Sequence, residues 1–212
     1  DGSTDQSREI IQHYSDPRIV YLAFPSNKGC IDALDYGLRH AQGKWIARMD
    51  CDDMCDPNRL EKPIEFLESH PGFVFLSTIS NLISPAGKLL QRKEQFSGWK
   101  SISQLDLTTG NHKMIDPSVV YLRKAALDAG GYDFELKYEI PFWYRLLTQG
   151  TGAVLYEPLY YYRFRLDSLS RDNSDRESKR LISRSARLKY DPERAHLHSS
   201  WDKSTFPTAQ EL

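Results

Sequence analysis

Short apolar runs recur along the chain and alternate with stretches in which apolar residues follow helical spacing. The apolar runs are of strand length and predict strands over residues 19–24, 45–49, 73–79, 118–122 and 153–156. Helical spacing predicts one helix that carries Ile10, Ile11 and Tyr14, and further helices over residues 31–41, 57–69 and 142–147. Because strands and helices alternate through about residue 80, we expect an α/β fold with a mostly parallel sheet flanked by helices.

Three segments depart from this regular pattern. Pro63 lies inside the predicted helix 57–69 and should kink it, because proline lacks the N–H that a helix interior needs. Residues 84–116 are polar and rich in turn formers, so we expect irregular loops there. Residues 171–212 indicate a charged helix and a polar tail outside the main domain, residues 1–170. That helix is either solvated or in contact with a membrane surface or a partner.

Composition narrows the class of protein. The chain has 212 residues, of which 40% are hydrophobic and 27% charged, with a net charge of -1. These values are typical of one globular domain, and the near-zero charge argues against nucleic acid as a partner. No apolar run approaches the roughly 18–20 residues that a membrane span needs. The three cysteines, Cys30, Cys51 and Cys55, are too few and too uneven for a disulfide framework, so we expect free thiols and a cytoplasmic location.

The chain opens with the sequence Asp-Gly-Ser-Thr-Asp at residues 1–5, which is typical of the turn that follows a strand. We therefore expect a fold that is N-terminally truncated and lacks its first strands. Such a sheet would have an unpaired edge near residues 19–24 or 45–49, and unpaired edges promote self-association.

The strongest local signal is a group of carboxylates directly after a predicted strand. Residues 48–53 read Arg-Met-Asp-Cys-Asp-Asp and follow the apolar run that begins at Trp45. In open parallel sheets, ligands bind at the carboxyl ends of the strands. Neighbouring carboxylates repel one another unless a cation lies among them, and hard oxygen ligands suit Mg²⁺ or Mn²⁺ bound to substrate phosphates. The alternative is a solvated acidic turn that caps the helix after Pro57.

These residues resemble a known family. Residues 43–53, followed by residues 57–62, are similar to the Asp-x-Asp region of inverting family 2 glycosyltransferases, which have the Rossmann-like GT-A fold. Residues 1–5 resemble the nucleotide-binding loop of that family, and Asn27-x-Gly29 resembles its next element. Three later motifs follow in the family's order: Gly130-Gly131-Tyr132-Asp133, Trp143-x-Arg145-Leu146, and Tyr162-Arg163 with Ser168 and Ser170. The resemblance spans about residues 1–170.

Such an enzyme transfers a sugar, with inversion, from a nucleotide-diphosphate sugar to a hydroxyl of a glycan or lipid-linked acceptor, as in polysaccharide biosynthesis at the inner face of a membrane. The resemblance implies that Asp52 or Asp53 holds a divalent metal, Mn²⁺ or Mg²⁺. It also implies that Asp50 lies near the ribose or the metal, and that Asp1 lies near the nucleoside.

Three basic residues are candidates for phosphate binding. Lys28 and Arg48 are neighbours of the implied nucleotide site, although Lys28 is equally well explained as an ordinary surface charge. Arg165 stands where the family often has histidine. An arginine cannot ligate a metal, but its planar donors can bind a diphosphate. The family also often has histidine at the position of Asp116.

The catalytic base implied by the resemblance is Glu139. The family places an acidic residue six positions before the arginine of its Trp-x-Arg motif, which is Arg145 here. A carboxylate there takes the proton of the acceptor hydroxyl. The family usually has a Glu-Asp pair, whereas this chain has Tyr-Glu at residues 138–139, so Asp133 and Glu135 are fallback candidates.

Two alternatives to a metal-assisted glycosyltransferase remain. The first is a catalytically inactive fragment, or a binding or assembly module, of the same fold. The second is a different Mg²⁺ enzyme, such as a phosphotransferase, which would share only the acidic strand end, and the sequence offers no phosphate-cradling glycine loop for it.

Overall fold

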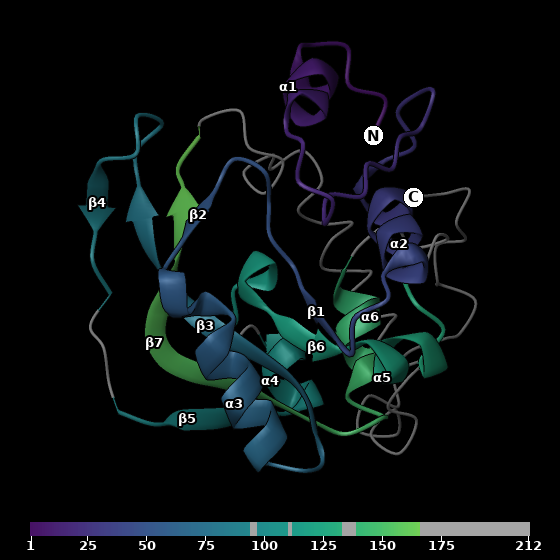
Figure 1. Ribbon diagram of the computed structural model, residues 1–212. Coiled ribbons are helices and arrows are strands. Elements are labelled where there is room, and N and C mark those ends of the chain that lie inside the picture. The colour runs from purple at the N-terminus through teal and green to yellow at the C-terminus, as the bar shows by residue number, and fades with distance from the viewer. Residues whose placement is uncertain (94–96, 110–111, 133–138, 166–212) are drawn as a thin grey trace, which may run out of the picture.

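One sheet of seven strands forms the middle of the described molecule (Figure 1). The computed structural model describes residues 1–93, 97–109, 112–132 and 139–165. The main path of the sheet runs, in spatial order, through β1 (Trp45–Ala47), β6 (Val120–Leu122), β3 (Phe73–Ile83), β7 (Thr151–Arg163) and β2 (Met54–Cys55). Off this path, β4 (Leu89–Gln91) pairs with β3, and β5 (Trp99–Ile102) pairs with β7.

The directions of the strands correct one expectation, that of a mostly parallel sheet. The α/β fold with flanking helices is confirmed, but among the described pairings only β3 and β7 run parallel, and the sheet is mixed. Strand β6 lies between β1 and β3 and is antiparallel to both. The chain reaches β6 through β4, β5 and a short helix, so the simple βαβ crossover that would give a parallel neighbour is missing there.

The strands predicted at 45–49, 73–79, 118–122 and 153–156 are present as β1, β3, β6 and β7, but the strand predicted at 19–24 is not. That segment pairs with no strand of the described chain, and Val20 is 74% exposed. An apolar run becomes a strand only where a neighbour accepts its backbone hydrogen bonds. Of the two edges anticipated, the one at β1 is confirmed, since β1 pairs with β6 alone among the described strands.

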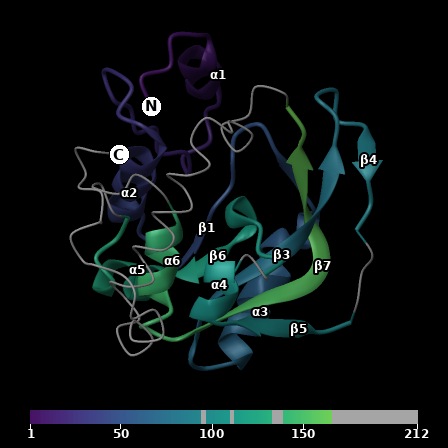
Figure 2. The same ribbon diagram turned by 180° about the vertical axis from the view of Figure 1, so that it is seen from behind.

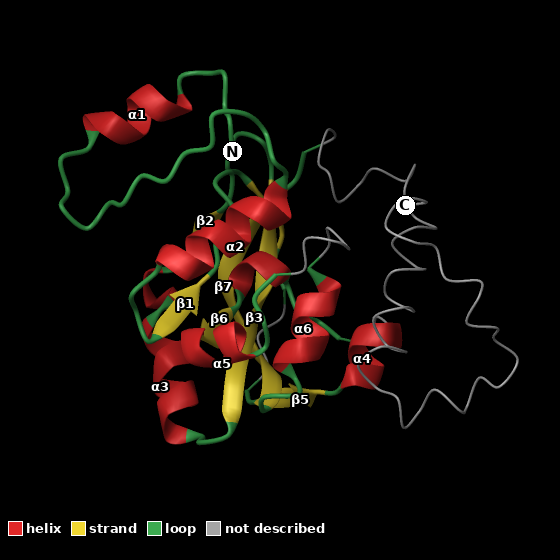
Figure 3. Cartoon of the chain, turned by 90° about the vertical axis from the view of Figure 1, so that its right-hand side faces the viewer, coloured by secondary structure: helices red, strands yellow, loops and turns green. Residues whose placement is uncertain are grey.

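Helices cover the sheet on both sides, as Figure 3 shows with α3 on one side and α4 and α6 on the other. The six helices of the described residues are α1 (Ser7–His13), α2 (Cys30–His40), α3 (Glu61–Ser69), α4 (Gln104–Thr109), α5 (Arg123–Asp128) and α6 (Ile140–Leu146). Helix α1 stands away from the sheet and buries none of its residues (Figures 1 and 2). None of the helices in the described part of the chain is long and apolar enough to cross a bilayer.

Two further expectations are wrong. Pro63 does not kink a long helix, because the chain forms a 3₁₀ turn at Pro57–Arg59 and then starts α3 at Glu61. Pro63 therefore lies in the first turn of α3, where backbone N–H groups have no partner in the helix anyway. The segment 84–116 is not irregular throughout, since it contains β4, β5 and α4.

Aromatic packing sets the position of α6. Phe142 and Trp143 are buried, and the Trp143 ring centroid lies 5.4 Å from that of Phe75 on β3. Tyr132 stacks on Phe142 with ring centroids 4.1 Å apart. This main core cluster lies on the α6 side, whereas Leu67 of α3 belongs to a separate cluster on the other face. Burial of these rings holds α6, and the residue before it, against the carboxyl end of β1.

The three cysteines are free thiols, as predicted. The predicted charged helix and tail, residues 171–212, lie outside the described residues, and so do Asp133 and Glu135.

Candidate active site

The chain leaves the sheet directly after β1 and forms the acidic turn of residues 50–53. The N–H of Arg48 still donates to the carbonyl of Val119, at 3.0 Å, and the N–H of Asp53 then donates to the carbonyl of Asp50, at 3.3 Å. The guanidinium of buried Arg59 donates to the carbonyl of Arg48 and, at 3.0 Å, to that of Pro117. The acidic turn therefore lies at a strand end, as the sequence predicted, and these hydrogen bonds hold its backbone.

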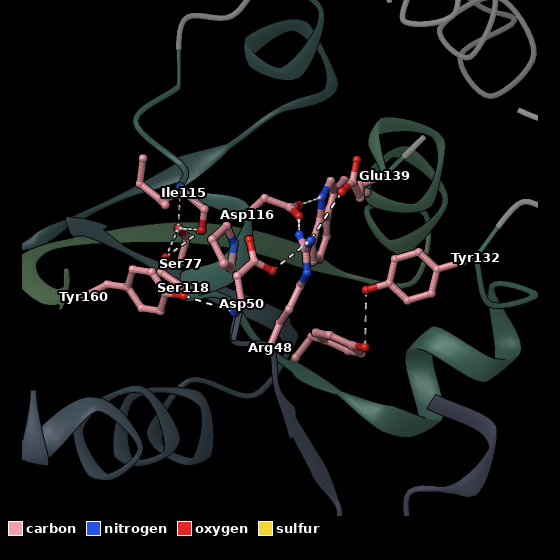
Figure 4. Close-up of polar contacts among 12 residues, drawn as sticks. Arg48, Asp50, Ser77, Ile115, Asp116, Ser118, Tyr132, Glu139 and Tyr160 are labelled. Carbon is pink, nitrogen blue, oxygen red and sulfur yellow. Dashed lines mark hydrogen bonds and ion pairs between the residues drawn. The ribbon is translucent and has the colours of Figure 1, made fainter. Parts of the chain in front are cut away.

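Arg48 is the centre of the site (Figure 4). Its side chain is only 6% exposed and forms ion pairs with three carboxylates. One guanidinium nitrogen lies 3.4 Å from Asp50 and 3.3 Å from Glu139, and the other contacts Asp116. Burial alone would lower the pKa of Arg48, but Asp50 and Glu139 outweigh it and raise that pKa. One buried cation thus brings the acidic turn, Asp116 and the predicted base Glu139 together.

Asp116 is held from a second side. Its other carboxylate oxygen accepts a hydrogen bond from the indole N–H of Trp143. Ser118 fixes the same segment to β3, because its hydroxyl accepts from the N–H of Thr78 at 3.0 Å and donates to the carbonyl of Ile115 at 2.7 Å. Sequence reasoning noted Asp116 only as a departure from the family. Its contact with Arg48 depends on how β6 and α6 pack, and no sequence spacing indicates it.

Residues of strand β7 hydrogen-bond to the acidic turn from the opposite side. The N–H of Arg163 donates to one carboxylate oxygen of Asp53, at 2.7 Å, and the Arg163 guanidinium donates to the carbonyl of Asp52. The hydroxyl of Tyr160 accepts from the N–H of Asp50, at 3.2 Å. Sequence reasoning did not foresee the role of Tyr160.

The carboxylates of the acidic turn differ in solvent exposure and in hydrogen-bond partners. Asp53 is 9% exposed, and its second oxygen is buried with no hydrogen-bond partner among the described residues. The side chains of Asp50 and Asp52 are 40% and 39% exposed. Burial raises the pKa of Asp50, and Asp53 and Asp52 add to the rise against the pull of Arg48. Burial also raises the pKa of Asp53. The ionised turn is therefore electrostatically costly by itself.

The carboxylates of the acidic turn suit a divalent cation that takes only one or two of its ligands from the protein. The described residues contain no group of three or more side chains that could enclose a metal. Asp52 and the unpartnered oxygen of Asp53 offer one or two hard carboxylate ligands instead. That number is usual for Mg²⁺ when substrate phosphates complete its coordination.

Asp1 joins two loops that are distant in sequence. Its carboxylate accepts hydrogen bonds from the N–H of Lys28, at 2.7 Å, and of Gly29, at 3.0 Å, just before α2 begins. Gly2 has φ +61, and a Cβ there would lie 2.4 Å from the backbone N of Asn27, so only glycine fits this turn. The side chain of Lys28 is exposed and contacts no residue of the acidic turn in the described chain.

Arg165 and Glu139 both lie beside the acidic turn. The guanidinium of Arg165 is 46% exposed and lies 3.9 Å from a carboxylate oxygen of Asp52. Glu139 directly precedes α6, and its side chain is 31% exposed while it pairs with Arg48. Among the candidates that the structure describes, all except Lys28 and Asp1 therefore contact Arg48 or Asp52 directly or through one intervening residue, as Asp53 does through Arg163.

The loop that follows α5 is fixed by two polar side chains, one buried and one half-buried. Asp35 of α2 is 1% exposed and accepts from the N–H of Tyr132, at 2.9 Å. Gly131 has φ +75, and a Cβ there would lie 2.3 Å from the Asp35 carboxylate. Arg145 donates to the carbonyls of Ala129, at 3.0 Å, and of Gly131. The arginine of the Trp-x-Arg motif thus holds this loop rather than the acidic turn.

Known proteins resemble this chain in sequence and in fold. The family model described as "Glycosyl transferase family 2" matches residues 1–130. An uncharacterized glycosyltransferase of Haemophilus influenzae is 29% identical over 130 residues, which cover 61% of this chain and 48% of that protein. The amylovoran biosynthesis glycosyltransferase AmsE of Erwinia amylovora is 30% identical over 135 residues, which cover 62% of this chain and 49% of that protein. The chain spans about half the length of these two relatives.

A solved structure has the same fold. Residues 1–349 of S. aureus TarS, crystallised in complex with UDP-GlcNAc, superpose with a TM-score of 0.67. The match covers 96% of this chain and 63% of that chain at 18% sequence identity. At that identity the likeness shows the fold.

Proposed function

Because the chain belongs to glycosyl transferase family 2, we propose that its acidic turn and Glu139 form the active site of an enzyme that transfers a sugar from a nucleotide-diphosphate sugar to an acceptor hydroxyl with inversion. The observation that supports this most is the ion-pair centre at Arg48, which joins Asp50 and Glu139 at the carboxyl end of β1. A donor site and a base must be adjacent for direct transfer, because the acceptor oxygen attacks the carbon that carries the leaving diphosphate.

For the donor, we assign the nucleoside to the loop of Asp1 and the ribose to Asp50. The TarS complex with UDP-GlcNAc supports a nucleotide sugar as the ligand of this fold. Asp52 and the free oxygen of Asp53 would hold Mn²⁺ or Mg²⁺. The cation would offset the charge that develops on the leaving diphosphate. Arg165, and Lys28 at the loop that Asp1 organises, would bind diphosphate oxygens.

For the acceptor, Glu139 takes the hydroxyl proton while the acceptor oxygen bonds to the anomeric carbon. The bond from that carbon to the diphosphate breaks on the opposite face, so the anomeric configuration inverts. Arg48 holds the Glu139 carboxylate in position at 3.3 Å. The acceptor is a glycan or a lipid-linked glycan at the inner face of the membrane, and the role of AmsE in amylovoran biosynthesis supports polysaccharide assembly.

The second candidate is a non-catalytic binding or assembly module of the same fold. The ion pair between Glu139 and Arg48 favours it, because a carboxylate that neutralises a buried arginine has a structural reason to be present. This candidate predicts nucleotide binding without turnover.

The test uses the full-length protein with a panel of UDP, GDP and dTDP sugars, with Mn²⁺, with Mg²⁺ or with EDTA. We expect one donor class to bind and to release nucleoside diphosphate only with the metal. Asp52→Asn should weaken metal-dependent binding, whereas Asp128→Asn on α5 is the matched control at an exposed acid of a different element. If no nucleotide sugar binds with either metal, the proposed function is wrong; binding without release favours the module.

A further inference from the structure

Strands β3, β4 and β7 and the 3₁₀ turn before α3 line a cavity of about 550 Å³. This volume is within the range of small-molecule sites, about 300–1,000 Å³. Neither the acidic turn nor Glu139 lines the cavity, so it is distinct from the candidate active site. The two nevertheless adjoin, because Met54, which directly follows Asp53, pairs with Tyr161 in the cavity wall.

The cavity lies beside a break in the pairing of β3 with β7. Between Thr78 and Ile79 of β3, the partner on β7 advances from position 155 to Pro158. Proline has no N–H to donate, which suits it to an irregular position of this kind. Such a bulge bends the strand, and Figure 1 shows β7 strongly curved. Glu157 and Pro158 of the bulge belong to the cavity wall.

Asn81 supplies a fixed hydrogen-bond donor in this wall. The residue is only 6% exposed, and its side-chain oxygen accepts from the N–H of Lys93, at 2.9 Å. That bond identifies which end of the amide is the oxygen, and the other end is therefore the NH₂ group. The NH₂ group of Asn81 has no acceptor among the described residues. A buried donor without a partner is costly, so this group favours a ligand oxygen in the cavity.

Tyr161 adds a second polar group beside an apolar surface. It lies opposite Asn81 in the register of β3 with β7, so the two side chains are on the same face of the sheet. The half-buried Tyr161 hydroxyl has no hydrogen-bond partner among the described residues, and a phenol both donates and accepts. Its ring, together with Leu89 and Leu159, gives the wall an apolar part.

The charges in the wall are mixed. Glu157 pairs with Lys62 of α3, and the Asp56 carboxylate accepts a backbone hydrogen bond from the turn that follows it, at 2.9 Å. Arg92 and Lys93 are the other charged residues of the wall, so acids and cations are both present. A charged ligand would meet both signs, whereas hydroxyl groups can donate to the acids and accept from the amide and ammonium groups.

We propose that this cavity is a second glycan-binding site, which holds neutral sugars of the acceptor chain away from the sugar that receives the new bond. The inference rests on the proposed function, because the bound glycan is the acceptor. Sugar hydroxyls accept from the Asn81 amide, donate to Asp56 and pair with the Tyr161 hydroxyl. The apolar face of a sugar ring packs against the Tyr161 ring and Leu89.

The test measures binding of the full-length protein to a printed array of neutral and acidic bacterial oligosaccharides, in EDTA and without nucleotide sugar. We expect neutral oligosaccharides to bind, and isothermal titration then gives the affinity of the strongest neutral binder. That affinity should change less than about twofold up to about 0.5 M NaCl, because salt screens attraction between charges. An array that binds no neutral oligosaccharide, or an affinity that falls tenfold with salt, overturns the inference.

Variants test whether the oligosaccharide occupies this cavity. Asn81→Asp keeps the oxygen that accepts from the N–H of Lys93 but replaces the free donor by an acceptor, so affinity should fall about tenfold or more. Tyr161→Phe keeps the ring and removes the hydroxyl, and affinity should fall about two- to tenfold. Tyr14→Phe, at a residue 66% exposed outside the cavity, is the control and should change affinity less than about twofold.

Nucleotide-sugar affinity and thermal unfolding are measured on the same variants to show that each is folded. An oligosaccharide affinity that is unchanged in both cavity variants overturns the inference, and Tyr161→Phe decides alone if Asn81→Asp does not fold. If donor binding is intact and no neutral oligosaccharide binds, only the glycan site is wrong. If an oligosaccharide binds in the cavity and no nucleotide sugar binds, the proposed function fails by itself.

Discussion

Arg48 shows at the scale of one residue how the site is held. A single buried guanidinium pairs with Asp50, Asp116 and Glu139, which come from three separate parts of the chain. Removing it would leave three carboxylates close together without their cation. The partners are 26–40% exposed, so water would compensate in part.

We therefore expect Arg48→Met to lower the free energy of unfolding by about 1–3 kcal/mol, less than for a pair with both partners fully buried. Urea unfolding at pH 7 measures this. Arg18→Met is the control, because the Arg18 side chain is 88% exposed in its ion pair with Asp16 and its loss should leave the midpoint nearly unchanged. An Arg48→Met protein as stable as wild type would contradict the role of Arg48 as the centre of the site.

Glu139→Gln tests the base. The amide keeps the size of the side chain but cannot take a proton, so we expect turnover to fall by about 10²–10⁴ while donor affinity stays within about twofold. Steady-state assays and titration of the full-length protein measure both quantities. Glu65→Gln on the exposed face of α3 is the matched control. If Glu139→Gln retains more than about a tenth of wild-type turnover, another acid acts as the base, and Asp133 and Glu135 are the next to test.

Asp53→Asn tests the charge of the acidic turn through its pH dependence. The pKa of Asp53 is raised in the folded protein, chiefly by burial, so the native state holds the proton more tightly than the unfolded chain. Wild type should therefore lose stability, relative to the variant, as pH rises from about 3.8 through the raised pKa, and the difference should then level off. Asparagine keeps the oxygen that accepts from the N–H of Arg163.

Thermal unfolding in EDTA across pH 3.5–8 measures this difference. We expect Asp53→Asn to be the more stable protein at pH 7 and the two to converge at low pH. A difference that does not change with pH would show that the Asp53 charge costs the fold nothing.

At the scale of elements, the parallel pair β3 and β7 depends on one glycine. A Cβ on Gly152 would lie 2.0 Å from the ring of Phe75, which is fully buried. Phe75 in turn packs against Trp143 of α6. The absence of a side chain at position 152 therefore lets the aromatic core reach the strand that carries Tyr160 and Arg163 to the acidic turn.

Gly152→Ala should destabilise the fold by about 1–3 kcal/mol, because neither the strand nor the buried ring can shift freely. Gly37→Ala in α2 is the control, and it is expected to change stability in the opposite direction. Nothing lies within 4 Å of a Cβ there, and alanine in a helix should stabilise by about 0.5–1 kcal/mol. Chemical unfolding of both variants measures these changes in the free energy of unfolding. A neutral Gly152→Ala would mean that Phe75 can rotate away at little cost.

At the scale of the whole molecule, the N-terminal segment carries exposed apolar side chains. Ile10, Tyr14 and Val20 are 56%, 66% and 74% exposed, and β1 is one open edge of the described sheet. Exposed apolar groups and open edges both favour contacts between copies.

We expect the 212-residue chain to self-associate at micromolar concentration, and Ile10→Lys with Val20→Lys to shift it toward monomer. Sedimentation velocity over a range of concentrations measures this. Leu60→Lys, at a residue 50% exposed near α3, adds one charge elsewhere and should not change the association. A wild-type chain that is monomeric at every concentration would show that these residues do not mediate contacts.

The sequence by itself determined the features that depend on local pattern. The apolar runs at β1, β3, β6 and β7 predicted those strands, because the length and residue types of such a run favour extended backbone by local pattern alone. The acidic turn after β1 and its order among the other motifs predicted the family, which the match over residues 1–130 confirms. The resemblance also identifies Glu139 and Arg165, whose side chains lie beside the acidic turn in the structure.

Only the tertiary structure decided which distant side chains meet. Arg48 and Glu139 are 91 residues apart, and their contact depends on the pairing of β1 with β6 and on the packing of α6 against Phe75. Strand direction and the absence of a strand at 19–24 depend likewise on which backbone finds a partner. The reason is physical: hydrogen-bond pairing between strands and ion pairing between side chains are set by three-dimensional neighbours, and the periodicity of one segment carries no information about them.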